Sequence, residues 1–225
     1  ELEGGISKFF EGKSKEITEK LSAKAGDLIL LCADSNYKTA CTALGAVRSK
    51  LGKDLCLANP DEFAFAWIID FPLFEWNEDE HKWDAAHHMF SMPQEKYHAT
   101  LESDPASVKG DLYDLVLNGY ELASGSIRIH DPDLQKRIFK IVGFNEEEGQ
   151  KKFGFLTEAF TYAPPHGGIA PGLDRLVMLM CKESSIKEVI AFPKNTFAVS
   201  PMDDCPSEVD EKQLKELHLQ INDRT

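Results

Sequence analysis

The segment Ser126–His130 places a guanidinium within a strand-like alternation of apolar and polar residues. In an extended strand the two isoleucines point to one side of the sheet, whereas Ser126, Arg128 and His130 point to the other. An arginine held on a rigid strand can bind a carboxylate through two parallel hydrogen bonds. An ordinary solvent-facing strand is the alternative, because antiparallel sheets are commonly wet on one side.

Asp114 and Glu121 could hold a divalent cation, because carboxylate oxygens suit hard metals and a metal that bridges phosphates needs only one or two of them. Their separation of seven residues would place them on opposite faces of a flat strand. A bulge or kink at Asn118-Gly119 would be required to bring them together. Without one, both are solvated carboxylates.

His87 and His88 form an adjacent pair that suggests a metal site, yet neighbouring residues of an extended chain point apart and no H-E-x-x-H pattern is present. The functional interpretation is a mobile loop, residues 85–93, that brings an imidazole over a bound ligand. A structural or merely exposed histidine is the competing interpretation.

A glycine-rich approach leads from His166 to Arg175, where we expect a helix over 173–181. Arg175 would lie in the first helical turn, where a cation meets the positive end of the helix dipole. A phosphate at the helix start would compensate, although Asp174 could do so instead. Gly172 would let a flat ligand approach the backbone. No P-loop or G-x-G-x-x-G pattern is present.

The order of segments predicts an α+β fold with a small module before a larger domain. For the module, residues 1–62, we expect a helix over 14–25, a buried strand over 27–33 and a helix over 35–51 that Gly52 ends. In the domain, residues 63–225, strand-forming runs interleave with helices, which favours an antiparallel sheet with helices on one face. Its expected elements are strands at 65–71, 113–121 and 126–130, a turn at 123–125, a hairpin end at 75–84, a short strand around Ile169, and helices opening at Asp131-Pro132 and at Asn145, the latter running toward Tyr162.

Composition bounds the class of protein. The chain has 225 residues with 42% hydrophobic and 28% charged residues, which is ordinary for a globular protein. A net charge of −13 argues against a non-specific nucleic-acid binder. The five scattered cysteines suggest neither a disulfide framework nor a zinc site. With no membrane span or signal peptide in the sequence, we expect a soluble cytoplasmic protein, and the lack of an initiator methionine suggests a fragment.

Several segments, taken in order, resemble the C-terminal part of the bacterial-type aspartyl-tRNA synthetases, which are class II enzymes. The segments are Ile69–Pro72, His87–Ser91, Asn118–His130, Phe153–Phe155, Pro164–Gly168, Gly172–Arg175 and Ala191–Lys194. The resemblance covers almost the whole chain, and residues 1–62 resemble part of the insertion domain of the bacterial enzymes. Pro171 stands where the family has a large apolar residue, so we expect weakened strand pairing there.

The resemblance implies a role for each matching residue. Arg128 would pair with the side-chain carboxylate of aspartate, and His87 would belong to the loop that closes over it. Glu121 would lie at the ATP and Mg²⁺ site with Asp114 as its partner. The ATP-binding element would comprise Gly172, Leu173, Asp174 and Arg175, and supporting positions would be His88, Ser126 and His130.

The resemblance also implies partners. These would be L-aspartate, ATP, Mg²⁺ and the aspartate tRNA, with the asparagine tRNA as a second candidate, in a full-length homodimer. The isolated piece would be inactive, because the anticodon-binding barrel and the first two class II motifs are missing from it. The alternative is a non-catalytic remnant that binds ATP or a protein through the same surface.

Overall fold

The computed structural model describes residues 5–222, and the chain divides into two compact units, Glu1–Glu62 and Phe63–Thr225. Each unit is described by itself. No helix within the described residues combines the length and apolar character that a membrane span requires.

The first unit contains short helices and extended chain. Its elements are η1 (Ser7–Phe10), α1 (Ser14–Lys20) and α2 (Tyr37–Asp54). The expected helix over 14–25 ends early, because Ser22 adopts a left-handed φ of 52° and the Ala23 amide bonds back to the Thr18 carbonyl. Gly52 does not end α2. The helix continues to Asp54 and is closed in the same way at Cys56, which has a φ of 50°.

The expected strand over 27–33 is wrong. These residues lie in extended chain that belongs to no strand, and most of them are exposed. An apolar run becomes a stable strand only when a neighbouring strand takes its backbone hydrogen bonds. The first unit supplies no such neighbour among its described residues.

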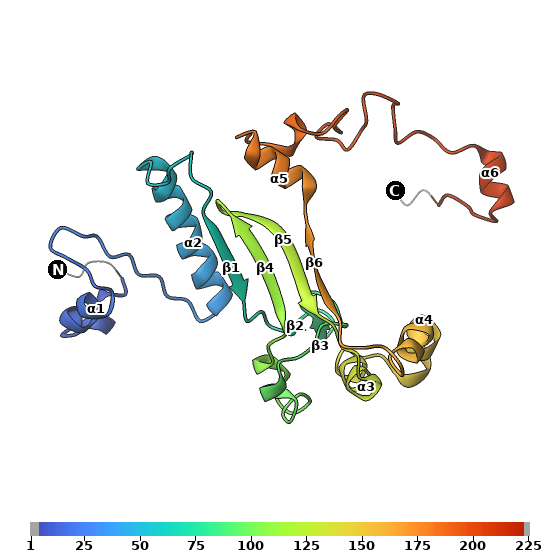
Figure 1. Ribbon diagram of the computed structural model, residues 1–225, viewed down its shortest axis with the longest axis horizontal. Coiled ribbons are helices and arrows are strands. Elements are labelled where there is room, and N and C mark those ends of the chain that lie inside the picture. Colours follow the sequence, from blue (N-terminus) through green and yellow to red (C-terminus); the bar gives the residue numbers. More distant parts are fainter. Residues whose placement is uncertain (1–4, 223–225) are drawn as a thin grey trace. The chain divides into compact units, whose positions relative to one another are not determined.

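The second unit is built on a four-stranded antiparallel sheet in the order β1-β4-β5-β6 (Figure 1). These strands are β1 (Phe65–Ile69), β4 (Leu112–Leu117), β5 (Tyr120–Ile127) and β6 (Gly167–Pro171). A separate hairpin pairs β2 (Phe74–Asn77) with β3 (Lys82–Ala85), as expected for residues 75–84. The antiparallel sheet with flanking helices confirms the α+β fold class.

The turn of the central hairpin lies at Asn118-Gly119, and the expected turn at 123–125 is wrong. Asn118 and Gly119 have φ values of 50° and 85°, the left-handed pair that a two-residue hairpin turn requires. Gly125 lies inside β5, where a Cβ would come within 2.3 Å of the Gly168 carbonyl oxygen. This glycine therefore permits close strand approach, and Glu121 belongs to β5.

Helices begin where capping residues predict them. Asp131 caps α3 (Pro132–Ile141) by accepting from two backbone amides, and Asn145 forms a capping box with Glu148 at the start of α4 (Glu146–Ala159). These two helices pack side by side (Figure 1). The remaining helices are α5 (Leu173–Met180), α6 (Glu211–Glu216), η2 (Glu95–Tyr97), η3 (Pro105–Ser107) and η4 (Ile186–Glu188).

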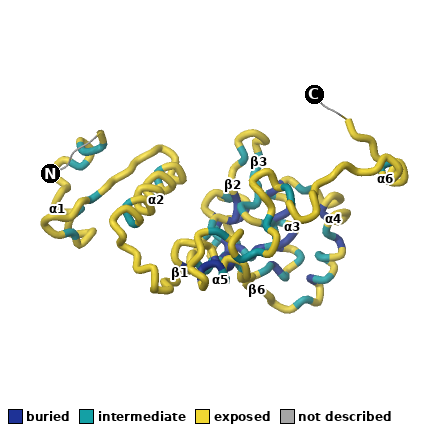
Figure 2. Tube along the Cα trace, turned by 90° about the horizontal axis from the view of Figure 1, so that it is seen from above, coloured by how far each residue is buried: buried dark blue, intermediate teal, exposed yellow. Residues whose placement is uncertain are grey.

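Two apolar clusters hold the second unit together, in which the buried residues of Figure 2 lie. The larger joins the β2–β3 hairpin to α3 through residues such as Phe74, Ile129 and Ile138. The smaller packs α5 against Leu117 and Leu122 of the sheet. Of the two isoleucines in Ser126–His130, Ile129 is buried, whereas Ile127, the last residue of β5, is 40% exposed.

Both edge strands of the sheet are exposed throughout their length. In β1 the large side chains Phe65, Trp67, Ile68 and Ile69 are 45 to 62% exposed. At the other edge, Pro171 does not disturb pairing. The Gly172 amide bonds to the Leu122 carbonyl at 2.8 Å, so by alternation the Pro171 nitrogen faces the open edge, where no ladder donor is needed.

Candidate functional site

The two candidate metal carboxylates lie on one face of the sheet. Glu121 pairs with Val116 across the hairpin, and directly opposed residues point to the same face. Asp114 precedes Val116 by two residues and therefore shares that face. The two-residue turn at 118–119 thus brings Asp114 and Glu121 to one face, although seven residues separate them.

A bulge extends this face toward Arg128. The β4–β5 register shifts between Leu115 and Val116, leaving Leu122 as the extra residue, so that Asp114 pairs with Ser124. Ser126 and Arg128 follow on the same side, since the Arg128 amide continues the pairing with a 2.9 Å bond to the His166 carbonyl. Arg128 lies about 13 Å from Ser124 along the strand.

The start of α5 meets the carboxylate end of this face. Arg175 Nη1 donates to the Glu121 carbonyl oxygen at 2.6 Å and lies 3.7 Å from Glu121 Oε1. Both side chains are half exposed. A pocket of about 240 Å³ opens here, lined by Glu121–Ser124, Ala170, Gly172–Arg175 and Ile186. Arg128 does not line this pocket, so the two arginines do not share one cavity in the described structure.

His88, rather than His87, contacts Arg128. Arg128 Nη1 donates to the His88 ring, and Ser91 Oγ lies 3.4 Å from the ring nitrogens. Burial lowers the pKa of His88, and the neighbouring Arg128 and His87 lower it further. A neutral ring can accept from the guanidinium. His87 is exposed and packs edge-on against Phe71 with ring centroids 5.1 Å apart.

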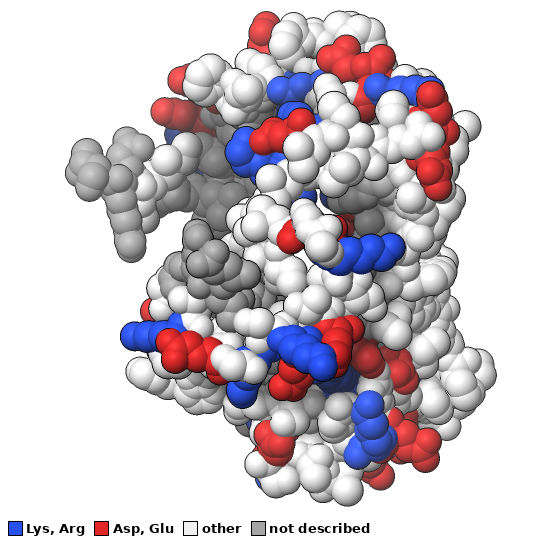
Figure 3. Space-filling view, turned by 90° about the vertical axis from the view of Figure 1, so that its left-hand side faces the viewer, with Lys and Arg blue, Asp and Glu red and all other residues white. Residues whose placement is uncertain are grey.

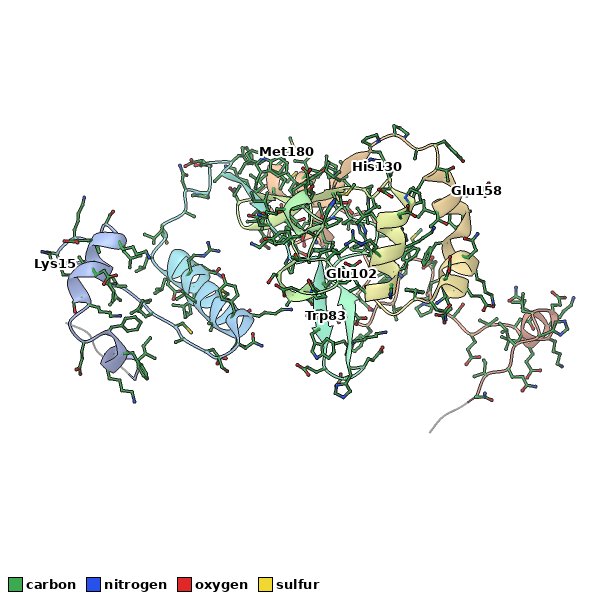
Figure 4. All side chains as sticks on the ribbon, turned by 90° about the horizontal axis from the view of Figure 1, so that it is seen from below. Lys15, Trp83, Glu102, His130, Glu158 and Met180 are labelled. Carbon is green, nitrogen blue, oxygen red and sulfur yellow. The ribbon has the colours of Figure 1, made fainter. Side chains whose placement is uncertain are left out.

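The two other supporting positions carry buried polar atoms. Ser126 is 1% exposed, and its Oγ has no hydrogen-bond partner among the described residues. His130, labelled in Figure 4, lies where the chain passes from β5 toward α3, and within the described part of the chain its Nδ1 likewise has no partner.

Sequence reasoning missed Ser124 on the carboxylate face and Gln135 in α3. The sequence did contain a signal for Ser124. Asn-Gly between apolar alternating runs strongly indicates a hairpin turn, and a turn at 118–119 places Ser124 in the strand that follows. Gln135 stands out only as an amide between buried positions of an amphipathic helix.

The charged side chains on the face of the molecule that Figure 3 shows do not point to a single ligand type. In the face that Figure 3 shows, basic and acidic side chains are interspersed rather than gathered by sign. Within residues 5–222 no group of three or more His, Cys, Asp or Glu side chains could hold a metal by itself. A cation at Asp114 and Glu121 would therefore need oxygen ligands from a bound substrate.

Comparisons with known proteins identify the family. The profile described as tRNA synthetases class II (D, K and N) matches residues 6–196. The chain is 78% identical over 99% of its length to the aspartate--tRNA(Asp/Asn) ligase of Treponema denticola, 66% identical to that of Treponema pallidum and 52% identical to that of Anoxybacillus flavithermus. It spans only 37 to 38% of the length of these relatives.

The solved aspartyl-tRNA synthetase of Entamoeba histolytica aligns with 83% of this chain and 32% of its own, at 24% identity and a TM-score of 0.48, a likeness too weak to add to the assignment. The profile match covers most of the chain, and the matched range includes the arginine, carboxylates and helix start described above. The chain belongs to the class II tRNA synthetases of the aspartate, lysine and asparagine group.

Proposed function

We propose that the full-length protein containing this chain activates L-aspartate with ATP and transfers it to tRNA. The α-carboxylate of aspartate attacks the α-phosphorus of ATP, pyrophosphate leaves, and aspartyl-adenylate forms. A hydroxyl of the terminal ribose of tRNA then attacks the activated carbonyl carbon and AMP leaves. The names of the relatives, aspartate--tRNA(Asp/Asn) ligases, support this proposal.

The observation that carries the choice of amino acid is the position of Arg128. Its guanidinium is half-buried on the carboxylate face, and the side-chain contact it makes among the described residues is the ring of His88. Such a group gains most from an anionic ligand. Asparagine would offer a neutral amide and leave the cation without a charge partner, so aspartate is preferred.

Asp114 and Glu121 fit a Mg²⁺ ion, because they offer hard oxygen ligands on one face and ATP phosphates can complete the coordination. When bound, the metal supplies positive charge that offsets the charge on the phosphates. Arg175, beside Glu121, would add a second cation for the nucleotide, and Gly172, Leu173 and Asp174 would shape the pocket with it. Catalysis would then rest on positioning and electrostatics rather than on a covalent nucleophile.

We further propose that both the aspartate and the asparagine tRNA are acceptors, as the names of the relatives state for those proteins. A cytoplasmic homodimer is the proposed form of the full-length protein. The isolated 225-residue chain is proposed to be inactive, because it spans 38% of the Treponema denticola relative.

Pyrophosphate exchange into ATP tests the activity. The purified full-length protein should catalyse exchange with aspartate but not with asparagine, and should charge both transcribed tRNAs. Exchange with neither amino acid, together with retained ATP binding, would contradict the proposal and favour a non-catalytic remnant. Charging of the aspartate tRNA alone would contradict only the proposal that the asparagine tRNA is also an acceptor.

A further inference from the structure

A glutamine of α3 is buried where an apolar residue would be expected. Gln135 is 0% exposed and lies among the buried residues Leu134, Ile138 and Phe139. Burying an amide among apolar groups costs free energy unless a hydrogen bond compensates. Methionine or leucine would fill a similar volume without that cost. The amide therefore calls for a specific partner.

That partner is the loop that carries the two histidines. Gln135 Nε2 donates to the Met89 carbonyl oxygen at 2.8 Å. A carbonyl only accepts, so the amide nitrogen must face it, and Oε1 is left without a partner among the described residues. One hydrogen bond from the amide thus holds the backbone directly after His88.

The other hydrogen bonds that join the loop backbone to neighbouring elements lie on either side of the two histidines. The Ala86 amide bonds to the Leu73 carbonyl at 3.0 Å, and the Ile129 amide bonds to the Phe90 carbonyl at 2.9 Å. Between Ala86 and Phe90, the bond from Gln135 is the one that joins the loop backbone to another element among the described residues. Without it, no hydrogen bond from another element would hold the backbone of residues 87–89 among the described residues.

Further hydrogen bonds join α3, which carries Gln135, to the segment around His98 and Glu102. Arg137, two residues beyond Gln135 on α3, pairs with Glu102 through bonds of 2.6 and 2.8 Å and donates to the His98 carbonyl at 2.6 Å (Glu102 is labelled in Figure 4). The guanidinium lowers the pKa of Glu102. These bonds and the Asp131 cap hold α3 in place. The position of α3 therefore determines where Gln135 holds the Met89 carbonyl.

We propose that Gln135 is a positioning residue for aspartate binding, which acts by holding the backbone at Met89 so that His88 meets Arg128. The inference rests on the proposed function. Loss of the amide lets the loop shift, and the His88 ring then no longer orients the guanidinium that receives the substrate carboxylate.

The test uses Gln135→Met in the full-length protein, with Gln135→Leu as a second variant in case the first folds poorly. The KM for aspartate in pyrophosphate exchange should rise about tenfold, the worth of one hydrogen bond, while the KM for ATP stays within about twofold. The matched control is Ile138→Val, which removes one methyl from the same buried face of α3. It should leave both KM values unchanged.

A second measurement does not depend on activity. The His88 imidazole is titrated by NMR in the wild type and in each variant. In Gln135→Met and Gln135→Leu the pKa of His88 should move up toward its ordinary value, because the ring leaves both its burial and Arg128, whereas in Ile138→Val it should stay low.

An unchanged aspartate KM together with an unchanged His88 titration would overturn the inference. So would equal rises in both KM values that Ile138→Val reproduces, since they would mark a general packing defect. A wild-type protein without aspartate-dependent exchange would sink the proposed function, and the NMR titration would still decide whether Gln135 holds His88.

Discussion

Replacing Arg128 by methionine should remove the preference for aspartate while leaving the rest of the site intact. Methionine retains a long unbranched side chain, so the loss is mainly the charged fork. Two charge-assisted hydrogen bonds to a carboxylate are together worth about 3 to 6 kcal/mol. Ordering the aspartate side chain against the fork offsets about 1 kcal/mol. The net loss of about 2 to 5 kcal/mol corresponds to a roughly 30- to 5,000-fold lower kcat/KM.

The assay is pyrophosphate exchange by the full-length protein, with aspartate and asparagine each varied at saturating ATP. In the variant, kcat/KM for aspartate should fall to the level measured with asparagine, because both side chains then meet a neutral pocket. The KM for ATP should hold, since the nucleotide elements lie at the other end of β5.

The control is Arg48→Met, which removes an exposed arginine from α2. It should behave as wild type with both amino acids. If Arg128→Met kept its aspartate kcat/KM, or lost it together with a comparable rise in the KM for ATP, the reasoning that Arg128 recognises the side-chain carboxylate would be refuted.

Three further predictions follow from other parts of the structure. Asp114→Asn and Glu121→Gln should each raise the Mg²⁺ concentration needed for half-maximal exchange, whereas Asp133→Asn, an exposed carboxylate on α3, should not; equal effects of all three would argue against the metal site. The lowered pKa of His88 means that the unfolded state binds more protons just below the ordinary histidine pKa of about 6.5. The free energy of unfolding of the wild type, measured by urea denaturation relative to that of His88→Gln, should therefore fall as pH drops through that region, by at most about 1.4 kcal/mol per pH unit. A difference between the two proteins that does not change with pH would contradict this prediction. The isolated 225-residue chain should self-associate in light scattering through its exposed β1 edge, and a lysine placed in that strand should reduce the effect, so a monodisperse chain would contradict the prediction.

Local chemistry predicted the helices of the second unit well. Asp131 and Asn145 mark the starts of α3 and α4, because a side-chain cap is a property of a few consecutive residues. The helix ends were less predictable. Ser22 and Cys56 adopt the left-handed conformation after α1 and α2, although Gly52 was expected to end the second helix. Where a helix ends depends on the bonds available to the following amides.

Pairing between strands was the harder part to predict. The apolar run at 27–33 has strand composition, yet nothing in its unit pairs with it. Ser124 and Gly125 look like a turn in sequence but lie inside β5, because the Asn118-Gly119 turn already reverses the chain. Similarly, a histidine pair cannot reveal which ring will meet Arg128, because Gln135 and Phe90 determine the course of the loop.

The candidate site depends on both the turn and the bulge of one hairpin. The turn alone places Glu121 on the face of Asp114, but a regular ladder would then pair Asp114 with Ala123 and send Ser124, with Arg128 after it, to the opposite face. The extra residue Leu122 shifts the register by one. Carboxylates and guanidinium then share a face, while Leu122 itself packs against α5 in the smaller apolar cluster. A single bulged residue therefore connects the packing of the sheet to the alignment of the metal carboxylates with the proposed aspartate-binding arginine.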